Sequence, residues 1–363
     1  MKIGIMSMQR VINYGSLLQA YGLKNIIESF GNEVEFVDYR VGQPLVNIGK
    51  KENFIKKIIT KKNKLVSIRM RIFNRNFTKY YSMIGIDKRC YNYNSNYDVM
   101  IIGSDEVFNC CQESKNVGYS LELFGYNCEA KKLISYAASF GNTTLSKLEF
   151  YNKQTEVAWG LNRFDEISVR DENSKSIICS ITDKIPSVNI DPVLLYDFSK
   201  DSLFNYVPDV KYKHIIIYAY PLRITDEECE SIRAFAKKNN YRILTIGGIQ
   251  KIGRFVACSP YEILGYFKNA EYIITDTFHG TIFSIVTKAK FVTIVRDSEN
   301  NNYGNYEKVY DLLNKFELVD RIVGNIKDIE LLLKLEIDYE KVDNMLDDER
   351  KKAIDYLKEY IAK

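Results

Sequence analysis

The sequence predicts an α/β protein made of two similar halves that face a central cleft, and three observations support this. The chain has 363 residues, more than one hydrophobic core usually supports, so two domains of ordinary size are expected. Short apolar runs alternate with helical patterns from the first residues, which is typical of βαβ units and a mostly parallel sheet. The same pattern restarts after the polar stretch Asp197–Lys213, which contains no periodic run.

The first half reads as a series of short strands separated by helices. The opening strand leads through Asn13-Tyr14-Gly15 into a helix that ends near Gly31, where a C-terminal cap belongs. Apolar residues recur in that helix at helical spacing: Ala20, Leu23, Ile27 and Phe30. The strands expected in this half are Lys2–Met6, Glu33–Asp38, Asp98–Gly103, Leu133–Ala137 and Glu166–Val169.

The second half repeats this alternation. Its expected helices are Asp226–Asn239, Tyr261–Asn269 and Gly280–Ala289. Its expected strands are Ile215–Tyr218, Ile243–Ile246, Tyr272–Thr275 and Phe291–Val295. Each half is therefore predicted to be Rossmann-like, and ligands of such sheets bind beyond the carboxyl ends of the strands.

We expect three parts along the chain. Residues 1–198 form an N-terminal Rossmann-like domain, and residues 199–340 form a C-terminal one. Residues 341–363 form a final helix, for which packing back on the first domain is one interpretation. Its apolar stripe consists of Val342, Leu346, Ala353, Leu357 and Ile361.

Composition excludes several function classes. The net charge of +4 comes with no nucleic-acid-binding signature, so no nucleic-acid partner is expected. His214 and His279 are the only histidines and lack flanking ligand spacing, so no metal site is predicted. No run of eighteen apolar residues or signal peptide is apparent, and seven cysteines without a CxxC pair favour a reduced, cytoplasmic chain.

Residues 50–79 stand apart because they contain eleven basic residues and one acid, interleaved with apolar ones. Charged stretches of this kind usually form a solvated helical excursion packed on the body of a protein. The second interpretation is peripheral contact with the inner face of a membrane, because basic amphipathic segments bind anionic lipid surfaces.

His279 is the strongest candidate for chemistry. It stands between the strand Tyr272–Thr275 and the helix Gly280–Ala289, with hydroxyls from Thr277 and Thr281 in the same turn. The amides of a helix N-terminus attract anions, and Gly280 would let a ligand approach the backbone. An imidazole here could protonate a substrate or bind a phosphate. The alternative is a helix-starting histidine with local hydrogen bonds.

Polar residues follow other strands at the same expected edge. Ser104-Asp105-Glu106 follows Asp98–Gly103, where a carboxylate could act as base toward a hydroxyl or bind a sugar. A helix N-cap is the alternative. Asn13-Tyr14-Gly15 occupies the first β-to-α loop, either as a cleft contact or as an ordinary turn.

Two arginines follow strands in the same way. Arg170 ends Glu166–Val169 and offers a fork suited to carboxylate or phosphate. Its alternative is a salt bridge to Asp171 or Glu172. Arg296, after Phe291–Val295, is analogous, whereas Trp159 in a predicted helix is expected in the core.

Together these segments resemble the polysaccharide pyruvyl transferase family. The stretches that carry the resemblance are GIMSMQRVINYGSLLQAYGL through VDYR, then YDVMIIGSDEVFN, ISYAASFG, ISVRD, DPVLL and TDTFHGTIFSIV. The resemblance implies a glycosyltransferase-B-like fold and transfer of a pyruvyl group from phosphoenolpyruvate to sugar hydroxyls, with release of phosphate. It implies no cofactor, and it places a histidine at His279 and an arginine at Arg170 on the donor.

The sequence departs from the family pattern in two places. Some members carry arginine where this chain has Thr277, so a phosphate-binding charge is expected from elsewhere, such as Arg296 or Lys288. Gln-Val-Trp-Asn of many members is replaced here by Glu106-Val107-Phe108-Asn109, which removes an indole. These departures bear on the substrate more than on the fold.

The expected mechanism assigns His279 as acid and Asp105 as base, with Arg170, Thr277, Gly280, Thr281 and Arg296 on the donor. The acceptor or cleft residues are expected to be Asn13, Tyr14, Gly15, Ser104 and Glu106. The acceptor side is expected on the N-terminal domain and the donor side on the C-terminal domain. The acceptor is a sugar of a surface polysaccharide or its precursor, nucleotide- or lipid-linked, and the oligomeric state stays open. The alternatives are a nucleotide-sugar-dependent glycosyltransferase and a non-catalytic sugar-binding subunit of polysaccharide assembly.

Overall fold

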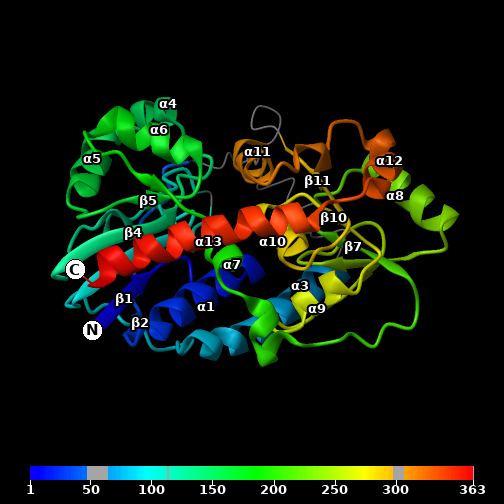
Figure 1. Cartoon of the computed structure of the whole chain (residues 1–363), viewed down its shortest axis with the longest axis horizontal. Coiled ribbons are helices and arrows are strands. Elements are labelled where there is room, and N and C mark those ends of the chain that lie inside the picture. The colour runs from blue at the N-terminus through cyan, green and yellow to red at the C-terminus, as the bar shows by residue number, and fades with distance from the viewer. Residues whose placement is uncertain (47–63, 113, 297–305, 363) are drawn as a thin grey trace.

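The structure is a computed structural model that describes residues 1–46, 64–112, 114–296 and 306–362. It contains two parallel sheets that lie at opposite ends of the molecule, with helices on both faces of each (Figure 1). This is the two-sheet α/β architecture that the alternation of apolar runs predicts.

The first sheet has the strand order β2-β1-β3-β4-β5-β6, and every neighbouring pair is parallel. Its strands are β1 (Lys2–Met6), β2 (Glu33–Phe36), β3 (Val99–Asp105), β4 (Lys132–Ala138), β5 (Ser168–Val169) and β6 (Ser187–Val188). Nearly every residue of β1, β3 and β4 is buried, as expected for strands covered on both faces.

The second sheet has the order β12-β11-β10-β7-β8-β9 and is also parallel. Its strands are β7 (His214–Tyr218), β8 (Arg242–Ile246), β9 (Arg254–Phe255), β10 (Tyr272–Thr275), β11 (Phe291–Ile294) and β12 (Ile322–Val323). The edge strands β9 and β12 have two residues each, too short for a periodicity to be recognised in the sequence.

The described helices pack on both sheets and connect them. The α-helices are α1 (Tyr14–Ser29), α3 (Lys64–Phe77), α4 (Leu145–Phe150), α5 (Gln154–Asn162), α6 (Glu172–Ile181), α7 (Pro192–Leu195), α8 (Asp226–Lys238), α9 (Ile263–Lys268), α10 (Phe278–Val286), α11 (Tyr306–Lys315), α12 (Ile329–Lys334) and α13 (Tyr339–Ala362). The 3-10 helices are η1 (Thr78–Ile84), η2 (Leu121–Phe124), η3 (Phe198–Lys200), η4 (Ser202–Phe204), η5 (Val319–Arg321) and η6 (Ile326–Asp328).

Helix α13 runs from the second sheet back to the first, where its last turns contact β4 (Figure 1). All five residues of its predicted apolar stripe are buried. The hydroxyl of Tyr356 donates to the carbonyl of Ser135 in β4 at 2.9 Å. One hydrophobic cluster contains residues of both sheets, so the two halves share a core along this helix. The domain limits at residues 198 and 340 stay a prediction.

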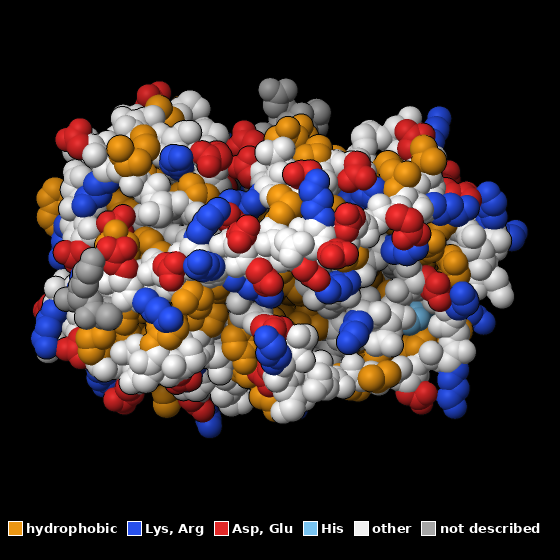
Figure 2. All heavy atoms as spheres, in the orientation of Figure 1, with side chains coloured by type: hydrophobic (Ala, Val, Ile, Leu, Met, Phe, Trp, Pro, Cys, Tyr) orange, Lys and Arg blue, Asp and Glu red, His pale blue; other side chains and the backbone are white. Residues whose placement is uncertain are grey.

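The structure describes only part of the basic segment 50–79, because residues 50–63 lie outside the described residues. Helix α3 buries Phe73 and Phe77 in the core and leaves Arg69, Arg71 and Arg75 exposed. It is thus a helix packed on the body of the protein. Figure 2 shows basic and acidic side chains interspersed over the face in view.

The expectation for Trp159 is wrong. Its side chain is 53% exposed on α5, where it packs against Tyr126 with ring centroids 4.5 Å apart. The apolar spacing of α5 is satisfied by Val157 and Leu161, which are fully buried, so the indole faces outward.

Candidate active site

A cleft of about 850 Å³ lies between the two halves, at the carboxyl ends of their strands. Residues that follow β1, β3 and β5 line one wall, and residues that follow β7 and β10 line the other. The polar and charged side chains of its lining are Asn13, Ser16, Asn74, Asp105, Glu106, Gln112, Ser114, Arg170, Arg223, Asp276, Thr277, His279 and Lys308. Ligands of parallel α/β sheets bind at such edges.

His279 reaches this cleft from the first turn of α10. The helix begins at Phe278, two residues earlier than expected, because the hydroxyl of Thr277 caps it by accepting the amide of Gly280 at 2.9 Å. His279 is therefore the second residue of the helix, close to its positive end. Its imidazole is 8% exposed and packs against Gly15 of α1, where a β-carbon would lie only 2.6 Å from His279 Cδ2.

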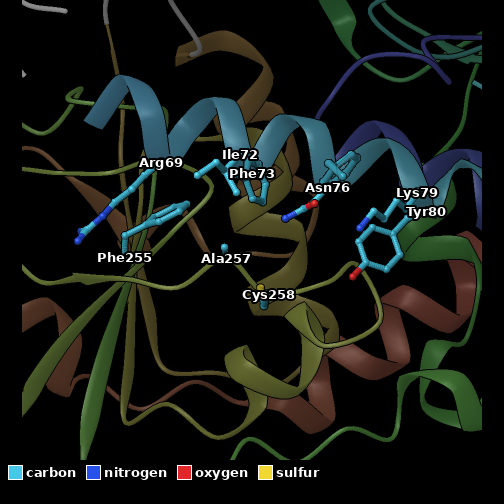
Figure 3. A pocket seen from close by; sticks show the side chains of 10 residues that line it. Arg69, Ile72, Phe73, Asn76, Lys79, Tyr80, Phe255, Ala257 and Cys258 are labelled. Carbon is cyan, nitrogen blue, oxygen red and sulfur yellow. The ribbon is translucent and has the colours of Figure 1, made fainter. Parts of the chain in front are cut away.

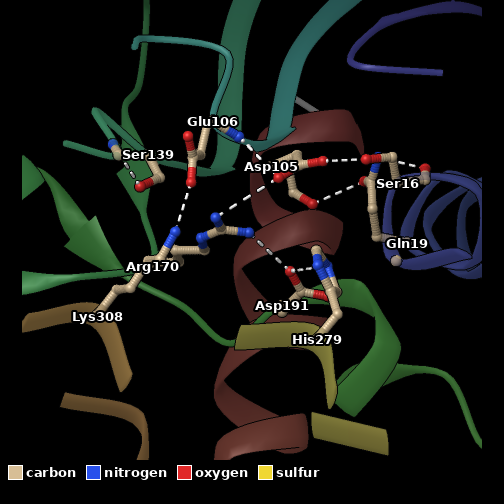
Figure 4. Close-up of polar contacts among 12 residues, drawn as sticks. Ser16, Gln19, Asp105, Glu106, Ser139, Arg170, Asp191, His279 and Lys308 are labelled. Atoms are coloured by element: carbon tan, nitrogen blue, oxygen red, sulfur yellow. Dashed lines mark hydrogen bonds and ion pairs between the residues drawn. The ribbon is translucent and has the colours of Figure 1, made fainter. Parts of the chain in front are cut away.

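One carboxylate connects His279 to Arg170 across the cleft (Figure 4). Oδ2 of Asp191 lies 3.0 Å from Nη1 of Arg170 and 3.5 Å from Nε2 of His279. The other oxygen, Oδ1, accepts the amide of Val193 at 3.0 Å and so caps α7. Because α7 fixes the carboxylate, the guanidinium and the imidazole are held on one anion.

The surroundings of Asp191 and Arg170 favour the charged forms of both side chains. Burial alone would raise the pKa of Asp191, but the imidazole of His279, the guanidinium of Arg170 and the Val193 amide offset it, and the net pKa is lowered. Burial alone would lower the pKa of Arg170, but the nearby carboxylates, led by Asp105 and Asp191, raise it. The arginine therefore stays cationic although its side chain is only 2% exposed.

Among the described residues, two nitrogens of the Arg170–Asp191–His279 contacts belong to the buried side-chain atoms without a hydrogen-bond partner. Nε of Arg170 and Nε2 of His279 are buried and make no hydrogen bond in the described structure. The distance of 3.5 Å from the imidazole Nε2 to Oδ2 of Asp191 is longer than an ordinary hydrogen bond. Unsatisfied buried polar atoms are rare in folded proteins. The role of His279 in chemistry stays a prediction.

Asp105 lies on the same side of the cleft as Arg170. Its Oδ2 accepts the Ser16 hydroxyl at 2.6 Å, and its Oδ1 lies 3.6 Å from Nη2 of Arg170. Its backbone φ is +70°, a left-handed conformation that non-glycine residues seldom adopt and that clusters at functional sites. Asp105 ends β3 and no helix follows it directly, so the N-cap interpretation is wrong.

The structure keeps several predicted residues out of the cleft lining. Ser104 is fully buried and donates to Gln19, and Thr281 is fully buried between Thr277 and Thr293. Gly280 lies against Thr275 and Tyr218, so its missing side chain serves helix packing.

The two suggested replacements for the missing arginine also lie elsewhere. Arg296 makes two hydrogen bonds to Glu228, at 2.6 and 3.0 Å, and Lys288 forms a surface ion pair with Asp343. Arg296 also approaches Oδ2 of Asp276 at 3.4 Å, and neither Arg296 nor Lys288 lines the cleft.

The first β-to-α loop does lie at the cleft. Asn13 caps α1 by accepting the amide of Gly15 at 2.7 Å, and its Nδ2 donates to the Tyr220 hydroxyl of the other half at 3.1 Å. Tyr14 is nearly buried, with its hydroxyl donating to the Cys258 carbonyl at 2.6 Å. Residue 15 must be glycine because the imidazole of His279 occupies the space that a β-carbon would need.

Sequence reasoning missed two charged residues of the site, Asp191 and Lys308. Asp191 precedes Pro192 and matches the pattern of a helix cap, which it also is. Lys308 lies in α11, away from any strand end, and its Nζ donates to Glu106 at 2.6 Å. A lone lysine in a polar helix carries no sequence signal for a cleft.

Other features of the described residues add no second reactive centre. No group of three or more His, Cys, Asp or Glu side chains among them is arranged to hold a metal ion, and none of their helices has the length and hydropathy to cross a membrane. A second cavity of about 430 Å³ lies between α3 and the segment after β9, lined by Ile72, Phe73, Phe255 and Cys258 with Arg69 and Lys79 (Figure 3).

The fold of the whole chain is similar to that of solved structures. The S. aureus MnaA–UDP co-structure matches with a TM-score of 0.52 at 11% identity, covering 99% of this chain and 96% of that one. Matches below a TM-score of 0.5 include the spinosyn rhamnosyltransferase SpnG with spinosyn aglycone (0.49, 9% identity, all of both chains) and the Methanocaldococcus jannaschii UDP-GlcNAc 2-epimerase with UDP-GlcNAc and UDP (0.48, 11% identity, 96% and 99%). No curated protein matches the sequence.

Two parallel sheets with a charged cleft between them define an α/β protein of the glycosyltransferase-B type, as the sequence predicts. The particular family follows from the sequence itself. The model of the polysaccharide pyruvyl transferase family matches residues 13–298, so the chain belongs to that family and is a transferase. The family resemblance and the fold class are thereby confirmed.

Proposed function

We propose that the protein transfers a pyruvyl group from phosphoenolpyruvate to two hydroxyls of a sugar in a surface polysaccharide or its precursor. The observation that carries this proposal is that Arg170 and His279, which both line the cleft, contact the same buried carboxylate of Asp191. It brings a permanent cation and an imidazole to one place, as a small anionic donor that must be protonated on carbon would require.

The donor carries a carboxylate and a phosphate. The guanidinium of Arg170 stacks on the Phe278 ring, 4.4 Å from its centroid, so its orientation is fixed before a ligand arrives. The positive end of α10 adds a further attraction for an anion. These groups would hold the donor beside His279 and stabilise the charge that develops on the leaving phosphate.

His279 would act as the general acid. The imidazolium, stabilised by Asp191, would give its proton to the methylene carbon of the donor, which turns C2 into an oxocarbenium-like electrophile. A sugar hydroxyl would attack C2 as its proton passes to Asp105. Attack by a second hydroxyl would break the bond between C2 and the phosphate oxygen. The two hydroxyl protons balance the one added to carbon and the one that leaves with phosphate.

The test is phosphate release from phosphoenolpyruvate against nucleotide-linked and lipid-linked sugars that carry two neighbouring hydroxyls. The proposal predicts phosphate release together with a gain in mass of the acceptor that corresponds to a pyruvate ketal. Release of UDP from a nucleotide sugar without use of phosphoenolpyruvate would instead identify a glycosyltransferase. Sugar binding with no phosphate released from any donor would identify a non-catalytic subunit.

A further inference from the structure

An ion pair crosses the cleft beside Arg170. Lys308 belongs to α11 of the second half, and its Nζ donates to Oε1 of Glu106, which follows β3 of the first half, at 2.6 Å (Figure 4). Both side chains line the cleft, and both are less than a tenth exposed. Lys308 lies beyond residues 13–298, which the family model matches, so the family pattern assigns it no role.

A contribution to folding stability does not by itself explain the Lys308–Glu106 ion pair. A buried ion pair often contributes nothing net relative to apolar residues, because desolvation of the two charges offsets their attraction. Glu106 also has neutral donors of its own: Nδ2 of Asn109 lies 2.8 Å from its Oε2, and Nε2 of Gln112 lies 3.3 Å from the same oxygen. The carboxylate is therefore held in place by more than the lysine.

The charge of Arg170 is largely countered before any donor arrives. Asp191 and Asp105 both lie within 4 Å of its guanidinium, and Glu106 adds to the same negative field. A donor with both a carboxylate and a phosphate needs another cation nearby. Thr277 supplies none, because a hydroxyl is uncharged and this one caps α10. Arg223 of the cleft lining pairs with Asp276 at 3.0 Å, on the side of the cleft formed by the second half.

We propose that Lys308 is a donor-binding residue whose ammonium group binds the phosphate of phosphoenolpyruvate next to Arg170. This inference rests on the proposed function and adds one residue to it. An ammonium group on a flexible stem suits a phosphate that must leave during the reaction, because it binds as a point charge without a fixed fork. Glu106 keeps that ammonium at the cleft wall until the donor binds.

Calorimetric titration of phosphoenolpyruvate into four proteins tests the inference: wild type, Lys308→Met, Lys308→Met/Glu106→Gln and Lys315→Met. Lys315 is the matched control, since it lies on the same helix and pairs with Glu349 at 3.0 Å but does not line the cleft. We expect about 10-fold or greater loss of affinity in both Lys308 variants, from the lost hydrogen bond to a charged group, and no loss in the control.

The double variant separates binding from charge neutralisation. If Lys308 only neutralises Glu106, removing both charges restores wild-type affinity, and that result would overturn the inference. Unchanged affinity in Lys308→Met would overturn it as well. The double variant leaves no unpaired carboxylate, so it provides a measurement even if the single variant does not fold. Failure of the wild type to bind phosphoenolpyruvate would reject the proposed function itself, a different result from binding that Lys308 does not affect.

Discussion

Gly15→Ala tests whether the position of the imidazole matters. An ideal β-carbon at residue 15 would lie 2.6 Å from Cδ2 of His279 and closer still to Cγ and Nδ1, whereas ordinary contacts begin at 3.4 Å. The ring must therefore retreat by at least the difference, 0.8 Å at Cδ2. A misplacement of about 1 Å in a catalytic group can cost about 10²-fold in rate, so we expect a loss of that order in kcat/KM.

The assay is phosphate release from phosphoenolpyruvate with a sugar acceptor, alongside urea unfolding. Overpacking of this kind costs about 1–3 kcal/mol, so the variant should remain folded. Gly324→Ala is the matched control, because a β-carbon there meets nothing within 4 Å and both its activity and its stability should stay unchanged. A folded Gly15→Ala variant with wild-type kcat/KM would refute the reasoning that the imidazole must occupy this position.

Three further predictions follow from the contacts around the cleft. Arg170→Lys should weaken the calorimetric affinity for phosphoenolpyruvate by about 10-fold or more, because the charge remains but the fork is lost; unchanged affinity would exclude donor binding by Arg170. Asp191→Asn should lower the free energy of unfolding at pH 7 by about 3–5 kcal/mol, since it leaves a buried guanidinium short of a partner. The pKa of Asp191 is lowered in the folded state, so its contribution is present above the unfolded pKa of about 3.9 and is lost as pH falls through the folded pKa. Urea unfolding of both proteins should therefore show a gap at about pH 5 that narrows below about pH 4, and a gap of the same size at about pH 3 would contradict the assignment. Lys288→Ala should leave donor affinity unchanged in the same calorimetric assay, because its ammonium group pairs with Asp343 at the surface; weaker binding would place it on the donor.

The sequence predicts the long elements of the fold well because their periodicity is strong. The strands Lys2–Met6 and Tyr272–Thr275 begin and end where expected, and helix α8 differs from its expected limits by one residue. Strands β6, β9 and β12 were missed because two residues carry no period. The start of α10 was misplaced because Phe278 reads as part of a loop until the capping hydroxyl of Thr277 is seen.

Candidate site residues at strand ends could be predicted because parallel strands bring their carboxyl ends to one edge. This reasoning found His279, Arg170 and Asp105, which the structure brings to one cleft. It could not find Asp191, whose sequence context indicates only a helix cap. It also missed Lys308, which reaches the cleft through the packing of α11 against the first half. Tertiary contacts alone reveal these two.

The most direct test of the central claim is single-turnover phosphate release from saturating phosphoenolpyruvate by wild type and His279→Ala, in the presence of a sugar acceptor. Loss of a general acid costs about 10²- to 10⁴-fold, so the variant should release phosphate at least about 10²-fold more slowly while it remains folded. Equal rates of phosphate release in the two proteins would contradict the assignment of His279 as the acid and, with it, the proposed chemistry of the cleft.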